Sequence, residues 1–202
     1  MTDIATDHQI AEEDALRADL YSYLSALLAS PPNRELIART AALTSDDTPL
    51  GKSFATLVKL AKATTPAAVE REFNALFIGL ARGELLPYAS YYMTGFLNEK
   101  PLALLRADMA AHGISRAPNV YEPEDNIASL LEMMAGMIEG RFGPPASLEA
   151  QKTFFNRHLA PWAQHFFTDL EGAKGSVFYA PVGAIGKIFM TIEREAFRLG
   201  GQ

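Results

Sequence analysis

The sequence contains no cysteine, and this absence excludes several classes of site. Without thiols the chain has no disulfide framework, no thiolate metal site and no cysteine nucleophile, which fits a reducing compartment. The N-terminal stretch MTDIATDHQIAEED is acidic and lacks the basic start and apolar run of a signal peptide. No window approaches the roughly 18 uninterrupted apolar residues of a membrane span. We therefore expect a cytoplasmic protein that does not insert stably into a membrane.

The chain has fewer basic than acidic residues. Eighteen Lys and Arg residues stand against 24 Asp and Glu residues, which gives a formal net charge of -6. This balance disfavours nucleic acid and anionic membranes as main partners, and a basic peptide segment would suit it better. The length of 202 residues is enough for one domain with its own core.

Alternating strand patterns of useful length, internal repeats and low-complexity tracts are also missing, so the predicted fold class is all-α. Apolar residues at helical spacing predict a single helical domain of roughly eight to ten helices. The expected helices lie at residues 12–30, 34–43, 52–63, 66–83, 101–112 and 123–140, in a segment from 147 that Pro161 breaks, and at 182–199. Segment 84–98 contains Pro87 and Gly95 and is expected to be a loop.

Motifs for catalysis, metals and nucleotides are absent as well. The only phosphate-loop fragment, GAIGK at 183–187, is followed by isoleucine and is a chance match. No Glu has a His three residues on, as a di-iron helix bundle requires, and no G-x-S-x-G element is present. We expect structural roles for the four histidines, which are His8, His112, His158 and His165. The sequence thus predicts no catalytic residue, no metal site and no cofactor.

What the sequence does contain is the acidic stretch NVYEPEDNIASLLEMM at 119–134, where Glu122, Glu124 and Asp125 crowd around Pro123. The simplest interpretation is helix capping, with Pro123 at the first helical position and the carboxylates favoured by the helix dipole. Catalytic acids and a receptor for positive charge are the alternatives. A polar strip continues along the expected helix, formed by Asp125, Ser129, Glu132 and Gly136.

The second notable stretch is ELLPYASYYMTGFLN at 84–98, which holds Tyr88, Tyr91, Tyr92 and Phe96. These rings could fill the core between helices. Alternatively, a non-helical loop of rings with polar tips could bind a partner. Amphipathic rings beside carboxylates suit a ligand with an apolar stretch and a cationic end.

Together, PYASYYMTGFL at 87–97, EFNALFIG at 72–79 and YEPEDNIASLLEMM at 121–134 resemble motifs of the TorD/DmsD/NarJ family of molybdoenzyme maturation chaperones. The likeness is greatest to the TorD-like branch. Asn126 stands where the family usually has histidine, so a role that needs a protonatable ring is not expected there. The residues that match the family's motifs, or stand within them, are Leu76, Phe77, Pro87, Tyr88, Ser90, Tyr92, Glu122, Pro123, Asp125 and Asn126.

The resemblance implies a chaperone that binds the N-terminal twin-arginine signal or leader peptide of a molybdenum-cofactor oxidoreductase. Such proteins keep the apoenzyme from premature export and assist cofactor insertion. The matching residues are then peptide-binding: Glu122 and Asp125 receive the cationic end, whereas Tyr88, Tyr92 and Phe77 receive the apolar run. GTP binding has been proposed for parts of the family, but this sequence has no phosphate loop, so no nucleotide is expected.

The segment 114–122 resembles the family's hinge between two helical lobes. The N-terminal lobe would span about 12–113 and the C-terminal lobe about 122–200. Because some members exchange lobes between two chains, a monomer and a domain-swapped homodimer are both open.

Three other functions stay open on the sequence. The first is a chaperone for a molybdoenzyme that is never exported, such as a formate dehydrogenase or nitrate reductase. The second is a small helical hydrolase that uses Glu122, Asp125 and Glu132 as paired carboxylates. The third is a regulatory interaction module. An enzyme should show a strongly perturbed carboxyl pKa in a closed pocket, whereas a peptide receptor should show an open groove.

Overall fold

The computed structural model describes residues 10–79, 82–118 and 120–200, and every regular element within them is a helix. Short π-helical turns at Asn74–Ile78 and Phe155–Leu159 continue the fourth and eighth helices. The predicted all-α class is confirmed. The α-helices are α1 (Glu12–Ala29), α2 (Arg34–Ala41), α3 (Pro49–Ala63), α4 (Pro66–Phe73), α5 (Ala89–Thr94), α6 (Lys100–Ala111), α7 (Ile127–Glu139), α8 (Leu148–Phe154), α9 (Ala163–Gly172) and α10 (Tyr179–Leu199).

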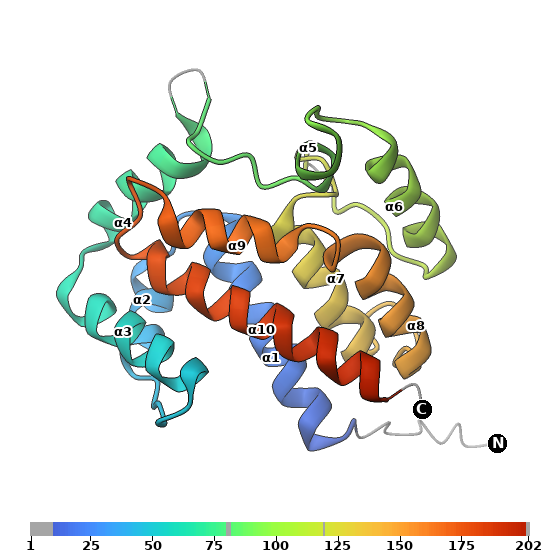
Figure 1. Cartoon of the computed structure of the whole chain (residues 1–202), viewed down its shortest axis with the longest axis horizontal. Helices are drawn as coiled ribbons and strands as arrows, with labels where there is room; N and C mark the ends of the chain where they lie inside the picture. The colour runs from blue at the N-terminus through green and yellow to red at the C-terminus, as the bar shows by residue number, and fades with distance from the viewer. Residues whose placement is uncertain (1–9, 80–81, 119, 201–202) are drawn as a thin grey trace.

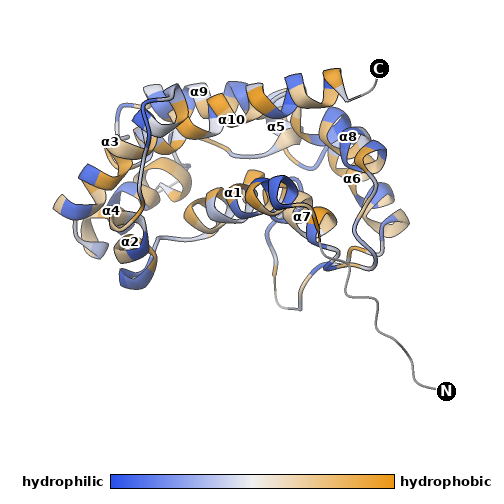
Figure 2. Ribbon diagram, turned by 90° about the horizontal axis from the view of Figure 1, so that it is seen from below, coloured by the Kyte–Doolittle hydropathy of each residue, from blue (hydrophilic) through white to orange (hydrophobic). Residues whose placement is uncertain are grey.

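The helices form two central pairs, with further helices at both ends. α1 packs along α7, and α9 packs along α10, which also contacts α3 (Figures 1 and 2). Helices α2, α3 and α4 lie together at one end, and α6 and α8 lie at the other (Figure 2). The apolar faces of the central helices meet in one core, in which Leu24, Leu131 and Phe189 are buried.

Local sequence signals explain several helix boundaries. The side chains of Asn33, Thr48, Thr65 and Ser147 each accept a hydrogen bond from a backbone N–H in the first turn of the helix that follows. Proline directly follows Thr48 and Thr65, at a position where a helix has no need of the N–H. Pro161 interrupts the helix from 148, as predicted, and α9 begins two residues later.

The structure corrects three predictions in the region of the two motifs. The helix expected to reach Gly83 ends at Ile78, where Gly79 turns the chain with a φ of 63°. Segment 84–98 is not a continuous loop, because it contains the short helix α5. Pro123 does not occupy the first helical position, since α7 begins at Ile127 with Asn126 as its N-cap. No acidic residue lies in the first turn of α7, so the three carboxylates do not cap that helix from within.

The two predicted lobes share the hydrophobic core. α1 belongs to the expected N-terminal lobe and packs on α7 of the expected C-terminal lobe, and α3 and α10 meet in the same way. The hinge at 114–122 and the choice between a monomer and an exchanged dimer stay predictions.

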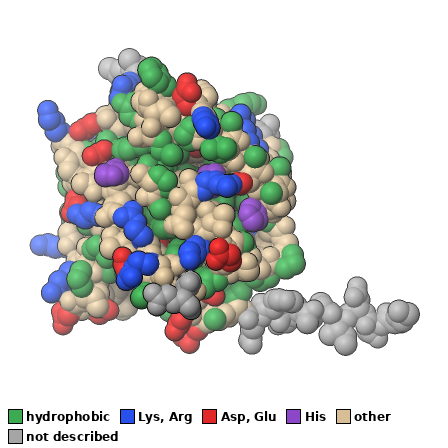
Figure 3. Space-filling view, turned by 45° about the vertical axis from the view of Figure 1, so that its right-hand side comes forward, with side chains coloured by type: hydrophobic (Ala, Val, Ile, Leu, Met, Phe, Trp, Pro, Cys, Tyr) green, Lys and Arg blue, Asp and Glu red, His purple; other side chains and the backbone are tan. Residues whose placement is uncertain are grey.

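The surface is mixed in character. On the face drawn in Figure 3, acidic and basic side chains are interspersed with hydrophobic ones. Among the helices that the structure describes, none has the length and apolar character needed to cross a bilayer.

Candidate functional site

Backbone hydrogen bonds fasten the aromatic stretch to the acidic stretch. Tyr88 and Asn126 form an isolated antiparallel bridge. The N–H of Ala89 donates to the carbonyl of Asp125 over 3.0 Å, and the N–H of Ile127 donates to the carbonyl of Pro87 over 2.8 Å. The two motifs are more than 30 residues apart in the sequence, and these bonds place them side by side.

Asp125 positions this junction from the inside. Its side chain is buried, with 1% of the residue exposed, and its Oδ2 atom accepts a hydrogen bond from the N–H of Ser90 over 2.8 Å. Ser90 is the second residue of α5, so Asp125 caps α5 across space. The carboxylate therefore does not face solvent, contrary to the expectation that it meets a cationic group directly.

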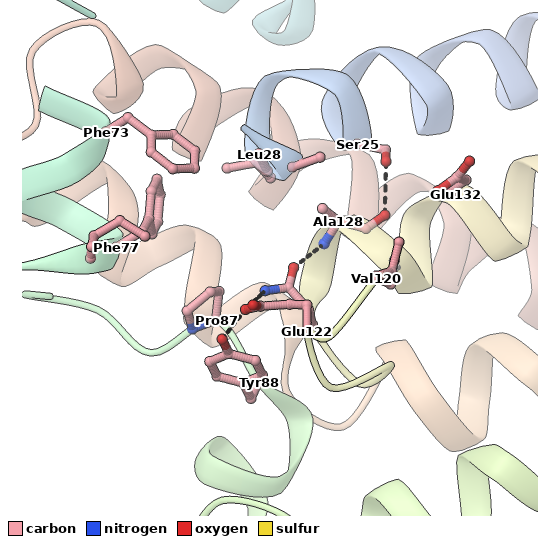
Figure 4. A pocket seen from close by; sticks show the side chains of 14 residues that line it. Ser25, Leu28, Phe73, Phe77, Pro87, Tyr88, Val120, Glu122, Ala128 and Glu132 are labelled. Carbon is pink, nitrogen blue, oxygen red and sulfur yellow. Dashed lines mark hydrogen bonds between the residues drawn. The ribbon is translucent and has the colours of Figure 1, made fainter. Parts of the chain in front are cut away.

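A pocket of about 490 Å³ opens beside the junction, and we call it the principal pocket. It brings together five of the ten residues predicted to bind a peptide: Phe77, Pro87, Tyr88, Glu122 and Asn126. Figure 4 shows Phe73 and Phe77 at one end and Glu132 toward the other. The remaining lining residues are Ser25, Leu28, Ala29, Ile78, Val120, Ala128 and Ser129.

The apolar end of the principal pocket is an aromatic wall. The rings of Phe73 and Phe77 meet edge to face with centroids 4.9 Å apart, and Phe77 meets Tyr179 in the same way at 5.6 Å. Leu28 from α1 lies opposite the two phenylalanines (Figure 4). An apolar side chain that enters here would lose contact with water on several sides.

Glu72, which the sequence reasoning missed, holds this wall in place. Its Oε1 atom accepts from the N–H groups of Val177 and Tyr179 over 2.7 and 2.8 Å, and its Oε2 atom accepts from Phe178 over 3.0 Å. These amides form the N-terminus of α10, which has no side-chain cap of its own. A carboxylate at a helix N-terminus is favourable. The missing local cap before Tyr179 was the signal that a distant acceptor would be needed.

The polar end of the principal pocket carries Glu122 and Glu132, both exposed. The hydroxyl of Tyr88 donates a hydrogen bond to Oε1 of Glu122, and the Nδ2 atom of Asn126 lies 3.4 Å from the same oxygen. Burial and the neighbouring Glu122 raise the pKa of Tyr88, so the phenol keeps its proton at neutral pH. Among the described residues that line the pocket, none is Lys, Arg or His. The mouth is therefore negatively charged.

Glu124 faces a different environment from Glu122. It accepts hydrogen bonds from Arg106 over 2.8 and 3.1 Å and pairs with Arg116 at 3.2 Å. Burial alone would raise the pKa of Glu124, but the hydrogen bonds and positive charges of the two arginines outweigh it and lower the pKa. Glu124 is thus neutralised within the fold, and neither Glu124 nor Pro123 lines the principal pocket.

Three other predicted residues lie outside the pocket. Leu76 is fully buried in the core, and Ser90 is buried at the start of α5. Tyr92 packs against Trp162 with ring centroids 5.3 Å apart and donates a hydrogen bond to Asp169 over 2.9 Å. The contacts of Tyr92 fix α5 to α9.

Asn126 caps α7 and also faces Glu122. Its Oδ1 atom accepts from the N–H of Ala128 over 2.9 Å and so caps α7, while its Nδ2 atom points to Glu122. Capping requires an acceptor beside the backbone, which an amide supplies at every pH.

The three carboxylates considered for a hydrolase do not all line one pocket. Glu122 and Glu132 line the principal pocket, whereas Asp125 is buried against Ser90 and is not among the lining residues. Across the described residues, no group of three or more His, Asp or Glu side chains is close enough to hold a metal ion.

Comparisons with known proteins agree with this architecture. The family model described as nitrate reductase delta subunit matches residues 43–168. The chaperone protein TorD of Vibrio cholerae is 29% identical over 170 residues, covering 74% of this chain and 77% of its own. The TorD chaperone of Aliivibrio salmonicida is 30% identical over 173 residues, covering 74% and 80%. That of Aliivibrio fischeri is 28% identical over 200 residues, covering 88% and 92%.

A solved structure shares the fold. It is described as a candidate redox enzyme maturation protein from Archaeoglobus fulgidus and superimposes with a TM-score of 0.56. The match covers 91% of this chain and 96% of the other at 19% sequence identity. At this identity the likeness concerns the arrangement of helices alone.

Proposed function

Because the chain belongs to the nitrate reductase delta subunit family, which is the TorD/DmsD/NarJ family of chaperones, we propose that it is a redox-enzyme maturation chaperone. Its principal pocket binds the N-terminal signal or leader peptide of a molybdenum-cofactor oxidoreductase. The partner is the apoenzyme, and the chaperone itself catalyses no reaction.

The observation that carries this proposal is the charge and shape of the principal pocket. One end is an aromatic wall, the mouth bears Glu122 and Glu132, and no basic side chain occurs among its described lining residues. A peptide with adjacent arginines beside an apolar run complements both ends. Guanidinium groups form paired hydrogen bonds with carboxylates, and apolar side chains gain about 25 cal/mol for each Å² removed from water.

The residues divide into contacting and positioning groups. Glu122 and Glu132 meet the cationic end of the peptide, while Tyr88 and Phe77 meet its apolar run. Asp125 and Ser90 act indirectly, because their buried hydrogen bond holds the aromatic stretch against the start of α7. Tyr92 acts indirectly as well, because it fixes α5 to α9.

The proposal extends to the twin-arginine leader of an exported client. A chaperone that covers such a leader delays export until the apoenzyme has received its cofactor. This task places the protein in the cytoplasm, where the leader is still attached. A client that is never exported, such as a formate dehydrogenase or nitrate reductase, would present a leader of similar chemistry to the same pocket.

Calorimetric titration tests the proposal. The purified chain is titrated with twin-arginine leader peptides of molybdoenzymes from the same genome, each beside a version with both arginines replaced by lysine. We expect saturable binding to one leader and weaker binding of its lysine version, since lysine cannot make the bidentate contact. If the chain binds no exported leader but binds the N-terminus of a non-exported molybdoenzyme, the client is an enzyme that is not exported. No binding to either would contradict the chaperone function.

A further inference from the structure

A second pocket of about 250 Å³ lies on the other side of the segment that carries Val120. Its apolar lining includes Met109, Ile114, Met133 and Phe142. Four residues, Val120, Glu122, Ser129 and Glu132, line both this second pocket and the principal pocket. The two cavities therefore adjoin along one face of α7, where Ser129 and Glu132 are one helical turn apart.

The apolar lining of the second pocket depends on a specific close approach. The ring of Phe142 lies so near α7 that a Cβ atom on Gly136 would be 2.4 Å from its Cε2 atom. Only glycine at position 136 lets the ring take this place. Phe142, which follows α7, thus forms part of the wall of the second pocket.

Charge distinguishes the two pockets. Arg116 and Arg141 line the second pocket, whereas the described lining of the principal pocket has no basic residue. Arg116 donates to the carbonyl of Glu122 over 3.0 Å, and Arg141 lies 3.8 Å from the carboxylate of Glu132. Glu124 also lines the second pocket and pairs with Arg116 at 3.2 Å, so the charges there are paired within the fold. At the mouth of the principal pocket no described basic side chain competes for Glu122, so a cationic side chain is favoured there.

We propose that the two pockets form one groove, in which a leader peptide binds in a fixed order. Its basic residues lie at Glu122 and Glu132, its longer apolar run covers the wall of Phe73 and Phe77, and an uncharged apolar side chain from the opposite flank of the basic residues enters the second pocket. This inference rests on the proposed function and adds a second specificity site to it.

Two observations favour this occupant. Val120 is 43% exposed and borders both pockets, so a peptide that crosses it buries an apolar side chain that is otherwise wet. The exposed carboxylates of Glu122 and Glu132 line both pockets, so basic residues of a peptide that bind them lie between its two apolar flanks. The second pocket has about half the volume of the first, which suits the shorter flank.

The absence of native cysteine allows a direct test by disulfide capture. Two single-cysteine variants are made, Ile78→Cys at the principal pocket and Ala117→Cys at the second pocket, both at exposed positions. The probes are synthetic peptides with two adjacent arginines and a run of leucines on each side, with one cysteine placed on either flank. Ala55→Cys on α3 is the matched control, because it is also exposed and lies on a different helix.

We expect Ile78→Cys and Ala117→Cys to capture opposite flanks of the peptide, each at least about tenfold more than Ala55→Cys does. A second variant, Ala117→Trp, fills the second pocket. It should weaken a peptide with two apolar flanks about tenfold and leave a peptide that lacks the short flank unchanged, because only the former loses a buried apolar side chain.

The outcomes separate the two claims. Capture by Ile78→Cys alone, with no effect of Ala117→Trp, would overturn the continuous groove and leave the proposed function intact. Capture of the same flank by both variants would overturn the fixed order. If neither variant captures either flank and the peptides do not bind in the calorimeter, both the groove and the leader-binding function are contradicted.

Discussion

Carboxylates occur in two contrasting regions of this molecule. In the seam between α4 and residues 174–179, Glu72 accepts three backbone N–H groups and Glu84 accepts those of Lys174 and Gly175. At the mouth of the principal pocket, Glu122 and Glu132 are exposed and make few contacts with the chain. The same residue type thus stabilises the fold in one region and presents charge in the other.

The difference follows from the hydrogen-bond donors around each carboxylate. Backbone amides at an uncapped helix end surround Glu72, so its oxygens are already satisfied. Around Glu122, a phenol and an amide use one oxygen and leave the other available. Asp125 is only three residues further on, but it is buried, and its Oδ2 atom accepts from a backbone N–H. Substitution of Glu72 should therefore change the free energy of unfolding, whereas substitution of Glu122 or Glu132 should change the affinity for a leader peptide.

The largest effect is expected for Glu72→Ala. The change leaves three backbone N–H groups at the start of α10 without their acceptor, and we expect the free energy of unfolding to fall by about 2–4 kcal/mol. Urea denaturation followed by circular dichroism measures it. Glu70→Ala, at an exposed position on the same helix, is the control and should change stability by less than about 0.5 kcal/mol. Equal losses of unfolding free energy in Glu72→Ala and Glu70→Ala would contradict the structural role of Glu72.

Asp125→Ala should come next. It removes the acceptor for the N–H of Ser90, and we expect a loss of about 1–3 kcal/mol in unfolding free energy. Leader affinity should fall by the same factor at low and high salt, because Asp125 acts by positioning the pocket. A fall in affinity that disappears at high salt would instead show that Asp125 meets the cationic group directly.

Glu122→Gln and Glu132→Gln should lower the affinity for a leader peptide and leave the stability of the fold unchanged. We expect each to weaken a basic leader peptide about two- to fivefold at low salt and by little at about 0.5 M salt, because exposed charge pairs are weak and screened. The free energy of unfolding should barely change. Calorimetry at both salt concentrations measures this, with Glu149→Gln on α8 as an exposed control. Strong destabilisation by either substitution would show that this glutamate stabilises the fold as Glu72 does, which contradicts the proposed difference between the two regions.

The smallest effect concerns the buried His158, which lies outside both regions and hydrogen-bonds the partly exposed Asp108 over 2.6 Å. Burial lowers the pKa of His158 below its usual 6.5, and Asp108 opposes this only in part. Protonation therefore favours the unfolded chain, so stability is full above pH 6.5 and declines as the pH falls through 6.5 toward the lower folded-state value.

Urea midpoints between about pH 7.5 and 5.5 test this expectation. His158→Gln should flatten the decline, whereas His165→Gln, at an exposed position, should leave it unchanged. A decline that persists in His158→Gln would assign the pH dependence to other groups.

Helical periodicity predicted most of the fold, because α1, α7 and α10 each bury an apolar stripe that is visible in the sequence. The helix α5 was missed, since its cap is the side chain of Asp125 from 35 residues further along the chain. The start of α7 was placed too early for a related reason: Pro123 fits a first turn, but Asn126 supplies the cap.

The candidate site was predicted in part. The motifs named Phe77, Pro87, Tyr88, Glu122 and Asn126, which the pocket does bring together. Spacing along the sequence could not separate Glu122 from Asp125, because their exposure depends on which backbone amides α5 places beside them. Phe73 and Leu28 were not predicted as pocket residues, since on the sequence they are ordinary members of apolar helix faces.

The most direct test of the account is hydrogen exchange measured by mass spectrometry with and without a bound leader peptide. The account predicts slower exchange in fragments that cover 73–79 and 120–132 when the peptide is present, with α3 unchanged as an internal reference. Protection confined to α3 or spread evenly over the chain, with the fragments around the principal pocket unaffected, would contradict the assignment of this pocket as the leader-binding site.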